Sequence, residues 1–262
     1  MAPYDPQDHW SSVGKQIRSR RDGNRLAGDD APYYRYKGYL VRTQLLPRVP
    51  VEGLSVLDVG CGAGGSLDRL AERNPKRLAG CDQSVEMVKL AAENVPQAEI
   101  RLMDGHHLPY EDREFDLVKT VTVLQHNPDD RRSALIAEIC RVARDYVVLF
   151  EDTATPRVPG NDGSGLYANY FGRPLDWYVD ECKKHGWLLI TSRSLATYVS
   201  HRTFNLLRGT LSRGRKEGQP LSPMHVAIER RTLPMTSRLD RVVPSRQWEL
   251  TMMMFRGTWR EY

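Results

Sequence analysis

Three glycines that follow a short apolar segment are the first residues whose type and spacing point to chemistry. Residues 56–65 read Val-Leu-Asp-Val-Gly-Cys-Gly-Ala-Gly-Gly. Gly60, Gly62 and Gly64 remove side chains where the backbone would leave a strand, and residues 66–70 are expected to continue as a helix. Because the start of a helix presents unpaired N–H groups, a ligand can lie against bare backbone there. The segment therefore predicts a ligand site at a strand–turn–helix junction.

Acidic residues stand at the ends of the first three predicted strands. Asp58 ends the first, Asp82 ends the second, and Asp104 follows the third. The carboxyl ends of parallel strands meet at one edge of a sheet, where a carboxylate after the second strand can accept both ribose hydroxyls. A carboxylate after the third strand can accept from the amino group of adenine. Each aspartate alone is equally typical of a helix cap or a turn, but the three in order predict a nucleoside site.

A dinucleotide site is the main alternative at this turn. Gly60, Gly62 and Gly65 fit the spacing G-x-G-x-x-G. Two observations favour a mononucleotide instead. Asp58 stands inside the strand, two residues before the first glycine, and the chain lacks the second mononucleotide-binding half that a dinucleotide needs.

Strands and helices alternate from residue 54 onward, which is typical of an α/β fold with a parallel sheet covered on both faces. The expected strands are 54–59, 77–81, 100–103, 115–123, 146–150, 187–194 and 247–255. The expected helices are 66–74, 85–94, 130–142 and 174–185. The first fifty residues are expected to form a polar helical arm.

These motifs resemble class I S-adenosylmethionine-dependent methyltransferases of the small-molecule type, over roughly residues 50–195 and 247–256. The resemblance implies a doubly wound, Rossmann-like sheet of seven mostly parallel strands with an antiparallel last strand and helices on both faces. It also implies S-adenosylmethionine as cofactor and S-adenosylhomocysteine as product. The cofactor-binding residues that it implies are Asp58, Gly60, Cys61, Gly62, Asp82, Gln83, Met87, Asp104, Gly105, His106 and Val121.

His126 is the candidate catalytic base, because it lies just past the fourth predicted strand at the active edge and imidazole titrates near neutrality. The alternative is that His126 buttresses the next helix. Glu151 and Asp152, expected just after the fifth strand, could orient substrate or lie in solvent. Methyl transfer needs a base only where the acceptor is a hydroxyl, a thiol or a protonated amine.

The domain organisation departs from the family in one place, an insertion between the last two strands. We expect a helical arm or lid at 1–50, a cofactor-binding core at 51–198 and 247–262, and a basic insertion at 199–246 that covers the acceptor together with loop 153–172. The insertion holds ten basic and three acidic residues. Three interpretations stay open: a solvated face, recognition of an acidic small molecule, or contact with nucleic acid or an anionic membrane.

The interpretation that these features favour is methyl transfer to a small-molecule acceptor. Nucleic acid is disfavoured as a partner, because the fourth strand lacks the Asn/Asp-Pro-Pro-aromatic turn of amino-directed DNA methyltransferases and Phe204 is the insertion's only aromatic residue. The alternatives are an RNA or protein methyltransferase, and a protein that binds the cofactor without transferring methyl. The sequence leaves the oligomeric state open, with a homodimer as one candidate.

Composition sets the remaining expectations. The hydrophobic content of 40% is ordinary for a globular protein, and no apolar run is long enough to span a membrane. The amino-terminal residues lack a signal-peptide pattern, so we expect a cytoplasmic protein. The four cysteines have neither paired nor metal-ligand spacing, which predicts neither a disulfide framework nor a metal site.

Overall fold

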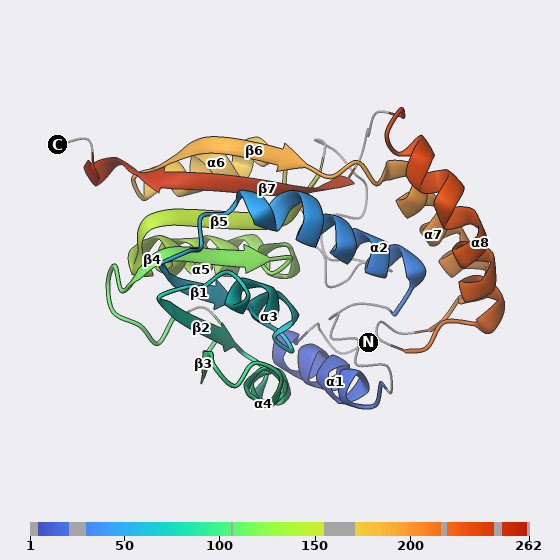
Figure 1. Ribbon diagram of the computed structural model, residues 1–262, viewed down its shortest axis with the longest axis horizontal. Helices are drawn as coiled ribbons and strands as arrows, with labels where there is room; N and C mark the ends of the chain where they lie inside the picture. The colour runs from blue at the N-terminus through green and yellow to red at the C-terminus, as the bar shows by residue number, and fades with distance from the viewer. Residues whose placement is uncertain are drawn as a thin grey trace.

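The computed structural model describes residues 5–20, 30–105, 107–154, 171–215, 219–243 and 248–260. They form one seven-stranded sheet with the order β3-β2-β1-β4-β5-β7-β6 (Figure 1). The strands are β1 Ser55–Val59, β2 Arg77–Asp82, β3 Glu99–Leu102, β4 Phe115–Val121, β5 Ala143–Ala154, β6 Trp187–Ser194 and β7 Trp248–Gly257. Strands β1 to β5 pair in parallel, and β7 pairs antiparallel with both β5 and β6. The predicted doubly wound sheet with an antiparallel last strand is confirmed.

Helices cover both faces of the sheet and bury two apolar clusters. One cluster lies between the sheet and helices α5 and α6. The other lies between the opposite face and α3, α4 and the turns that follow α2. The helices are α1 Pro6–Arg18, α2 Pro32–Leu40, α3 Gly65–Ala71, α4 Val85–Asn94, α5 Asp129–Val142, α6 Leu175–Lys184, α7 Tyr198–Leu211 and α8 Pro223–Leu239. Short helical turns lie at η1 Val41–Leu45, η2 Leu46–Arg48, η3 Leu124–His126 and η5 Thr258–Arg260.

Local sequence signals explain where several helices begin. Ser84 caps α4 by accepting a hydrogen bond from the backbone N–H of Met87. Gly64 starts α3 in the left-handed conformation, with φ of 83°, which a side chain would disfavour. Helix α8 begins with Ser222 as its cap and a proline in the first turn, a combination that suits a helix start.

Two strand boundaries differ from the sequence prediction. Strand β4 ends at Val121 rather than at residue 123, because Thr122 has φ of 55° and turns the chain into η3. Strand β5 runs over residues 143–154 rather than 146–150, because β7 pairs with it along residues 146–154. Glu151 and Asp152 therefore lie inside a strand, not in the loop that was expected after it.

The arm and the insertion are helical and lie beside each other. Helices α1 and α2 lie beyond the carboxyl ends of the parallel strands, and α7 and α8 pack together at the same end of the molecule (Figure 1). The two insertion helices were missed by the sequence analysis. In α8 the pattern is inverted, because its buried residues are His225, Glu229 and Thr236.

Other sequence expectations have structural counterparts. All four cysteines are free and buried. None of the helices in the described parts of the chain has the length and apolar character needed to cross a membrane.

Candidate functional site at the carboxyl edge of the sheet

The glycine turn after β1 is held against β2 by two backbone hydrogen bonds. The N–H groups of Gly60 and Cys61 both donate to the carbonyl oxygen of Cys81, at 2.8 and 3.0 Å. Gly60 has φ of 69°, and a Cβ there would lie 2.4 Å from a methyl carbon of Val123. Only glycine fits this position, because both the conformation and the space exclude a side chain.

Asp82 at the end of β2 faces that turn. Its Oδ2 accepts from the N–H of Gly62 at 2.9 Å, and its Oδ1 accepts from the N–H of Ser84 at 2.9 Å. Burial raises the pKa of the Asp82 carboxyl to about 6, although these backbone hydrogen bonds pull it down. The carboxyl group is therefore mostly ionised at neutral pH. The backbone of Gln83 also hydrogen-bonds to this carboxyl group, so its acceptor capacity is used mainly by the backbone and room is left for a further donor.

The ends of β2 and β3 converge beside Asp82. A Cβ on Gly105, where φ is 98°, would lie 2.8 Å from Oε1 of Gln83. Asp104 is exposed, and its Oδ1 accepts from the N–H of His107 at 2.6 Å. The structure thus brings Gln83 and Gly105 together and gives Asp104 a turn-forming hydrogen bond. His106 lies outside the described residues.

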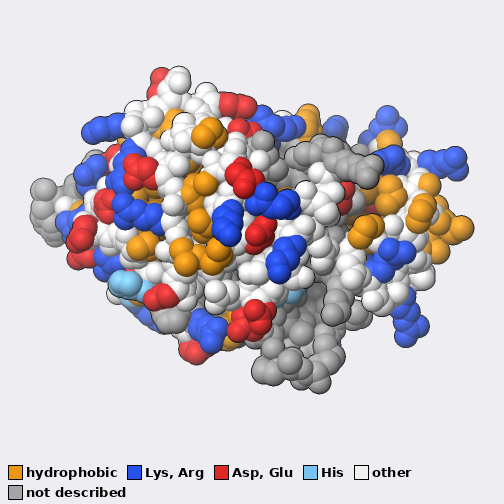
Figure 2. Space-filling model, turned by 90° about the horizontal axis from the view of Figure 1, so that it is seen from below, with side chains coloured by type: hydrophobic (Ala, Val, Ile, Leu, Met, Phe, Trp, Pro, Cys, Tyr) orange, Lys and Arg blue, Asp and Glu red, His pale blue; other side chains and the backbone are white. Residues whose placement is uncertain are grey.

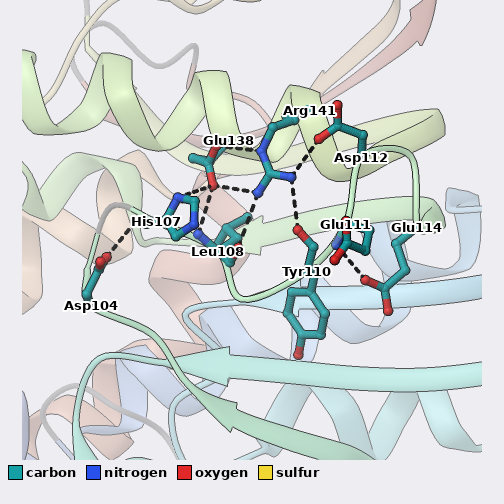
Figure 3. A network of polar contacts seen from close by, with 9 residues as sticks. All are labelled: Asp104, His107, Leu108, Tyr110, Glu111, Asp112, Glu114, Glu138 and Arg141. Atoms are coloured by element: carbon teal, nitrogen blue, oxygen red, sulfur yellow. Dashed lines mark hydrogen bonds and ion pairs between the residues drawn. The ribbon is translucent and has the colours of Figure 1, made fainter.

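The loop that carries these residues is fastened to α5 (Figure 3). Glu138 accepts from the N–H of Leu108 at 2.9 Å, and Arg141 donates to the carbonyl oxygen of Tyr110 at 2.9 Å. Arg141 also pairs with Glu138 at 2.6 Å. This network holds the start of the β3–β4 loop, so the Asp104 turn has a rigid support.

Asp58 lies under the glycine turn and is paired within the sheet. Its Oδ1 is 2.7 Å from Nζ of Lys119, its register partner on β4. Asp58 is 1% exposed and Lys119 is fully buried, and neither group makes another hydrogen bond among the described residues. The pair is a buried ion bridge between β1 and β4. Sequence analysis singled out Asp58 but missed Lys119, although a lysine in an apolar strand was a readable signal.

Helix α1 closes over the β1–β2 side of the edge. Met87 of α4 and Ala63 of the glycine turn are buried in one cluster with residues of α1. Arg18 of α1 pairs with Glu86 and Glu93 of α4, at 2.7 and 2.9 Å. The arm is therefore attached to the helix that follows Asp82.

The candidate base lies under the same helix. The rings of Trp10 and His126 meet edge to face, with centroids 5.1 Å apart. His126 is half-buried in η3, one turn after Val121 at the end of β4. The structure thus places His126 and Val121 at the carboxyl edge, beside the glycine turn that Val123 contacts.

Comparison with known proteins identifies this region. Residues 56–145, from β1 into β5, match the family model of a methyltransferase domain. This region is a methyltransferase domain. The matched residues include the glycine turn, Asp82 and Gly105.

Sequence relatives of the methyltransferase domain differ in what they modify. The chain is 39% identical over 108 residues to trans-aconitate 2-methyltransferase of Variovorax paradoxus, a match that covers 40% of this chain and 42% of that protein. It is 29% identical over 122 residues to tRNA U34 carboxymethyltransferase of Nautilia profundicola, over 45% of this chain and 40% of that protein. The chain thus spans less than half the length of these two curated relatives.

Solved structures share the fold along nearly the whole chain. The cyclase SpnF aligns with a TM-score of 0.64 at 15% identity, covering 96% of this chain and 95% of that one. Magnesium protoporphyrin IX methyltransferase from Synechocystis, solved with bound S-adenosylhomocysteine, aligns with a TM-score of 0.57 at 15% identity, covering 96% of this chain and 98% of that one. At this identity the likeness shows the fold of class I methyltransferases and nothing finer.

On the far side of β4, a carboxylate of β5 is buried under the η3 turn. Glu151 is fully buried and accepts from Thr120 Oγ1 at 2.9 Å and from the N–H groups of Val123 and Gln125 at 3.2 Å. Burial raises its pKa to about 7, against the pull of these hydrogen bonds. Glu151 supports the loop that carries His126, and it is not exposed to a ligand.

A polar cluster that the sequence did not reveal joins the arm and the insertion to this edge. Nζ of Lys37 on α2 pairs with Asp152 on β5 at 2.8 Å, and the N–H of Asp152 donates to Gln125 Oε1 at 2.7 Å. Burial alone would raise the pKa of Asp152, but the Lys37 ammonium outweighs it and the pKa is lowered. On α7, burial and then Lys37 lower the pKa of His201 to about 4. We name these four side chains, Lys37, Gln125, Asp152 and His201, the Lys37–Asp152 cluster.

The arm and the insertion also hold each other. The backbone N–H of Tyr33 on α2 donates to Glu229 of α8 at 2.9 Å. The ring of Tyr33 stacks on His201 and Phe204 of α7, with centroids 5.3 and 5.4 Å apart. Helices α2, α7 and α8 therefore form one packed unit above the carboxyl edge of β5.

Proposed function

We propose that this chain binds S-adenosylmethionine at the carboxyl ends of β1, β2 and β3 and transfers its methyl group to a small-molecule acceptor, leaving S-adenosylhomocysteine. One observation carries the proposal. Within a methyltransferase domain, the open glycine turn, the Asp82 carboxylate and the Gln83–Gly105 contact converge at one edge of the sheet. Loop residues at strand ends and a backbone free of side chains suit a nucleoside ligand.

The residues at this edge fit the adenosyl group. The Asp82 carboxylate suits a ribose hydroxyl, because it is held in place by the backbone and keeps acceptor capacity for a further donor. Gln83, Met87 and Gly105 line the place beside it, where the adenine ring belongs. Asp104 follows β3 at the same edge of the sheet and is proposed to accept from the adenine amino group. His106 is proposed to complete that contact through its backbone.

The methionine part belongs over the glycine turn, beside Gly60, Cys61 and Gly62. Asp58 is proposed to attract its amino group, but Lys119 already neutralises that carboxylate. We therefore propose that Asp58 acts as a shared acceptor below the turn rather than as an exclusive ligand. Val121, which is partly exposed at the end of β4, is the proposed neighbour of the sulfonium.

The cofactor supplies a methyl group that is already activated by its positive sulfur. What remains for the protein is to orient the acceptor in line, to exclude water and to remove a proton where the acceptor needs it. Helix α1 covers the cofactor side, with Trp10 against His126. His126 is the proposed base. A His126→Gln variant should lose the limb of the pH–rate profile that a neutral imidazole creates, and an unchanged profile would assign His126 to structure.

The acceptor chamber is proposed to lie beside the Lys37–Asp152 cluster, with the described helices of the 199–246 insertion as its cover. Residues 155–170 of the loop expected to share this role lie outside the described residues. The support is that Lys37, Gln125, Asp152 and His201 come from four different segments and meet beside the β4–η3 loop. A buried lysine–aspartate pair and a neutral histidine suit a small acceptor with polar groups, because these side chains can hydrogen-bond to such groups and the pair leaves no uncompensated charge in the site.

Calorimetry with S-adenosylhomocysteine tests the binding step. The wild type should bind, and Asp82→Asn should weaken binding by at least about tenfold, because a charge-assisted hydrogen bond to a hydroxyl is lost. Asp180→Asn, an exposed aspartate of α6, is the matched control and should bind as the wild type does. A folded wild type that gives no heat contradicts the proposal. A homocysteine-release screen over acceptor libraries then tests transfer.

A second candidate is a protein that holds the cofactor but catalyses another reaction. The similarity to a cyclase over nearly the whole chain favours keeping it. Cofactor binding without homocysteine release from any acceptor would support this candidate. An RNA acceptor remains the other alternative, given the tRNA-modifying relative, and it predicts RNA binding that weakens steeply with salt.

A further inference from the structure

Helix α8 is inside out. Its fully buried residues are polar, and its exposed residues include four large apolar side chains. The buried residues are His225, Glu229 and Thr236. The exposed residues are Met224 (62%), Ile228 (38%), Met235 (58%) and Leu239 (40%). At 100° per residue the four exposed side chains form one stripe along the helix. Val242, just past the end of the helix, continues the stripe at 74% exposure.

The polar residues inside are occupied in packing against α7 and α2. His225 Nδ1 lies 3.0 Å from Ser212 Oγ, and Glu229 accepts from the backbone of Tyr33. Asp240 accepts from the N–H groups at the start of α7 at 2.7 and 3.1 Å. These contacts fix the rotation of α8, so its apolar stripe is held outward by the fold.

Charge on the same face has a single sign. Arg231 and Arg238 follow Met224 at successive seven-residue intervals, so they lie on the same side of α8 as the apolar stripe, and Arg230 and Arg241 flank them. All four arginines are exposed. The two acidic residues in described residues 219–243, Glu229 and Asp240, are each 2% exposed. The solvent face of α8 therefore combines apolar and cationic side chains without a compensating carboxylate. We name it the α8 face.

The neighbouring helix extends this surface. Leu206 of α7 is 67% exposed, and Arg213 after the helix is exposed as well. Hydrophobic and arginine side chains lie side by side at the right-hand end of Figure 2, where α7 and α8 lie in Figure 1. Contiguous exposed apolar surface of this kind marks a binding face rather than an ordinary solvated one.

We propose that the α8 face docks onto an anionic lipid surface. Apolar side chains of a helix lying in the membrane plane enter the boundary between headgroups and acyl chains, while arginines at its margins pair with anionic headgroups. Methionine and leucine supply the first contact, and Arg230, Arg231, Arg238 and Arg241 supply the second. The inference does not depend on methyl transfer.

Charge distinguishes this partner from the other two that such a face could bind. A second copy of the chain, related by two-fold symmetry, would place the arginines of one face against those of the other, with no exposed carboxylate in the described stretch 219–243 to separate them. A nucleic acid would satisfy the arginines but leave the apolar stripe without a partner, and α8 offers no aromatic ring for stacking. An anionic bilayer satisfies both components.

Vesicle co-sedimentation tests the proposal with the full chain. The probes are phosphatidylcholine vesicles and vesicles of phosphatidylcholine mixed equally with phosphatidylglycerol. We expect binding to the mixed vesicles only, weakening as salt screens the arginines. Each arginine near the surface should contribute about fivefold to the partition constant. Equal or absent binding to both vesicle types overturns the proposal.

Two variants test the two components separately. Arg231→Glu/Arg238→Glu should lower the partition constant by at least about 25-fold, and Met224→Gln/Met235→Gln by at least about tenfold. The matched charge control is Arg131→Glu/Arg193→Glu, which changes the net charge equally at exposed sites on α5 and β6. The matched apolar control is Leu102→Gln/Ile190→Gln, at strand residues 49% and 50% exposed.

Both controls should bind mixed vesicles as the wild type does, and all four variants should keep the wild-type circular dichroism spectrum. Controls that weaken binding as much as the test variants would show a general charge or solubility effect and overturn the proposal. Light scattering measures the molar mass of the chain in solution. A dimer that Met224→Gln/Met235→Gln dissociates and the controls leave intact would assign the α8 face to a second copy and overturn the proposal. Salt-sensitive binding of RNA, together with no binding to either kind of vesicle, would assign the α8 face to nucleic acid instead.

Discussion

The buried pair of Asp58 and Lys119 gives the sharpest test of the structure. The perturbation is Lys119→Met, which keeps the length of the side chain and removes its charge. Lys119 is fully buried, Asp58 is 1% exposed, and their charged atoms are 2.7 Å apart. The variant leaves a carboxylate in the sheet without a countercharge. Breaking a buried pair in this way costs about 3–5 kcal/mol of unfolding free energy.

The size of the effect makes it easy to measure. For a chain of this length, about 3–5 kcal/mol lowers the melting temperature by about 6–20 °C. Urea unfolding followed by circular dichroism gives the free energy directly, provided that the slope with denaturant is unchanged. Lys183→Met, at an exposed lysine of α6, is the control and should change the unfolding free energy by no more than about 0.5 kcal/mol.

A double variant separates the interaction free energy of the pair from the effect of changing each residue alone. Asp58→Asn/Lys119→Met removes both charges, so it should be more stable than Lys119→Met alone, with a coupling free energy of about 1–3 kcal/mol. If Lys119→Met unfolds within about 1 kcal/mol of the wild type at neutral pH, the carboxylate is not buried beside this lysine and the geometry of the β1–β4 pair is wrong.

Three further predictions concern the turn, the buried glutamate and the arm. Gly60→Ala should cost about 2–5 kcal/mol of unfolding free energy, since it adds a clash to an unfavourable φ. The control Gly53→Ala, with φ of 72° and open space around it, should cost only about 1–2 kcal/mol. Equal costs in urea unfolding would contradict the close approach at Gly60. The pKa of Glu151 is raised to about 7, so the folded state holds a proton that the unfolded state has lost, and stability should fall as pH rises from about 4.5 to about 7. Glu151→Gln should lack this slope, a difference on the order of 3 kcal/mol between urea unfolding at about pH 5 and about pH 8, and parallel curves would contradict the burial of that carboxylate. Lys37→Met should lower the unfolding free energy by about 1.5–3 kcal/mol and speed proteolysis of the arm, because Asp152 loses its charged partner. Lys37→Arg should restore part of the stability and part of the protection. Cleavage of the arm at the wild-type rate in Lys37→Met would contradict the anchoring role.

Local sequence signals were sufficient for much of the core. Strand and helix positions between residues 54 and 142 followed from hydrophobic periodicity and from the turn-forming residues between segments, and the structure confirms them to within a few residues. The Ser84 cap is local, because it joins residues three apart in the chain, and the glycines mark the turn locally, although its hydrogen bonds run to Cys81 on β2. Asp82 could be placed from its position alone, since the end of a parallel strand always meets the same edge.

The insertion shows where local reasoning stopped. Its sequence has weak periodicity, yet it folds into two helices. In α8 large apolar residues such as Met224 and Met235 face solvent, while the fully buried residues are polar, so a rule that assigns apolar residues to the core misreads it. The extension of β5 to residue 154 was missed for a related reason, because its pairing partner β7 lies a hundred residues further along the chain.

The amino-acid sequence by itself determined the fold class, the glycine turn and the acids at the strand ends, because side-chain direction in helices and strands follows from the geometry of neighbouring residues. Only the tertiary structure decided that Lys119 neutralises Asp58, that Lys37 of the arm meets Asp152 of the sheet, and that the α8 face points outward. Each of these depends on which distant segments become neighbours when the core is buried, and that choice is made by packing and electrostatics across the whole chain rather than within any one segment.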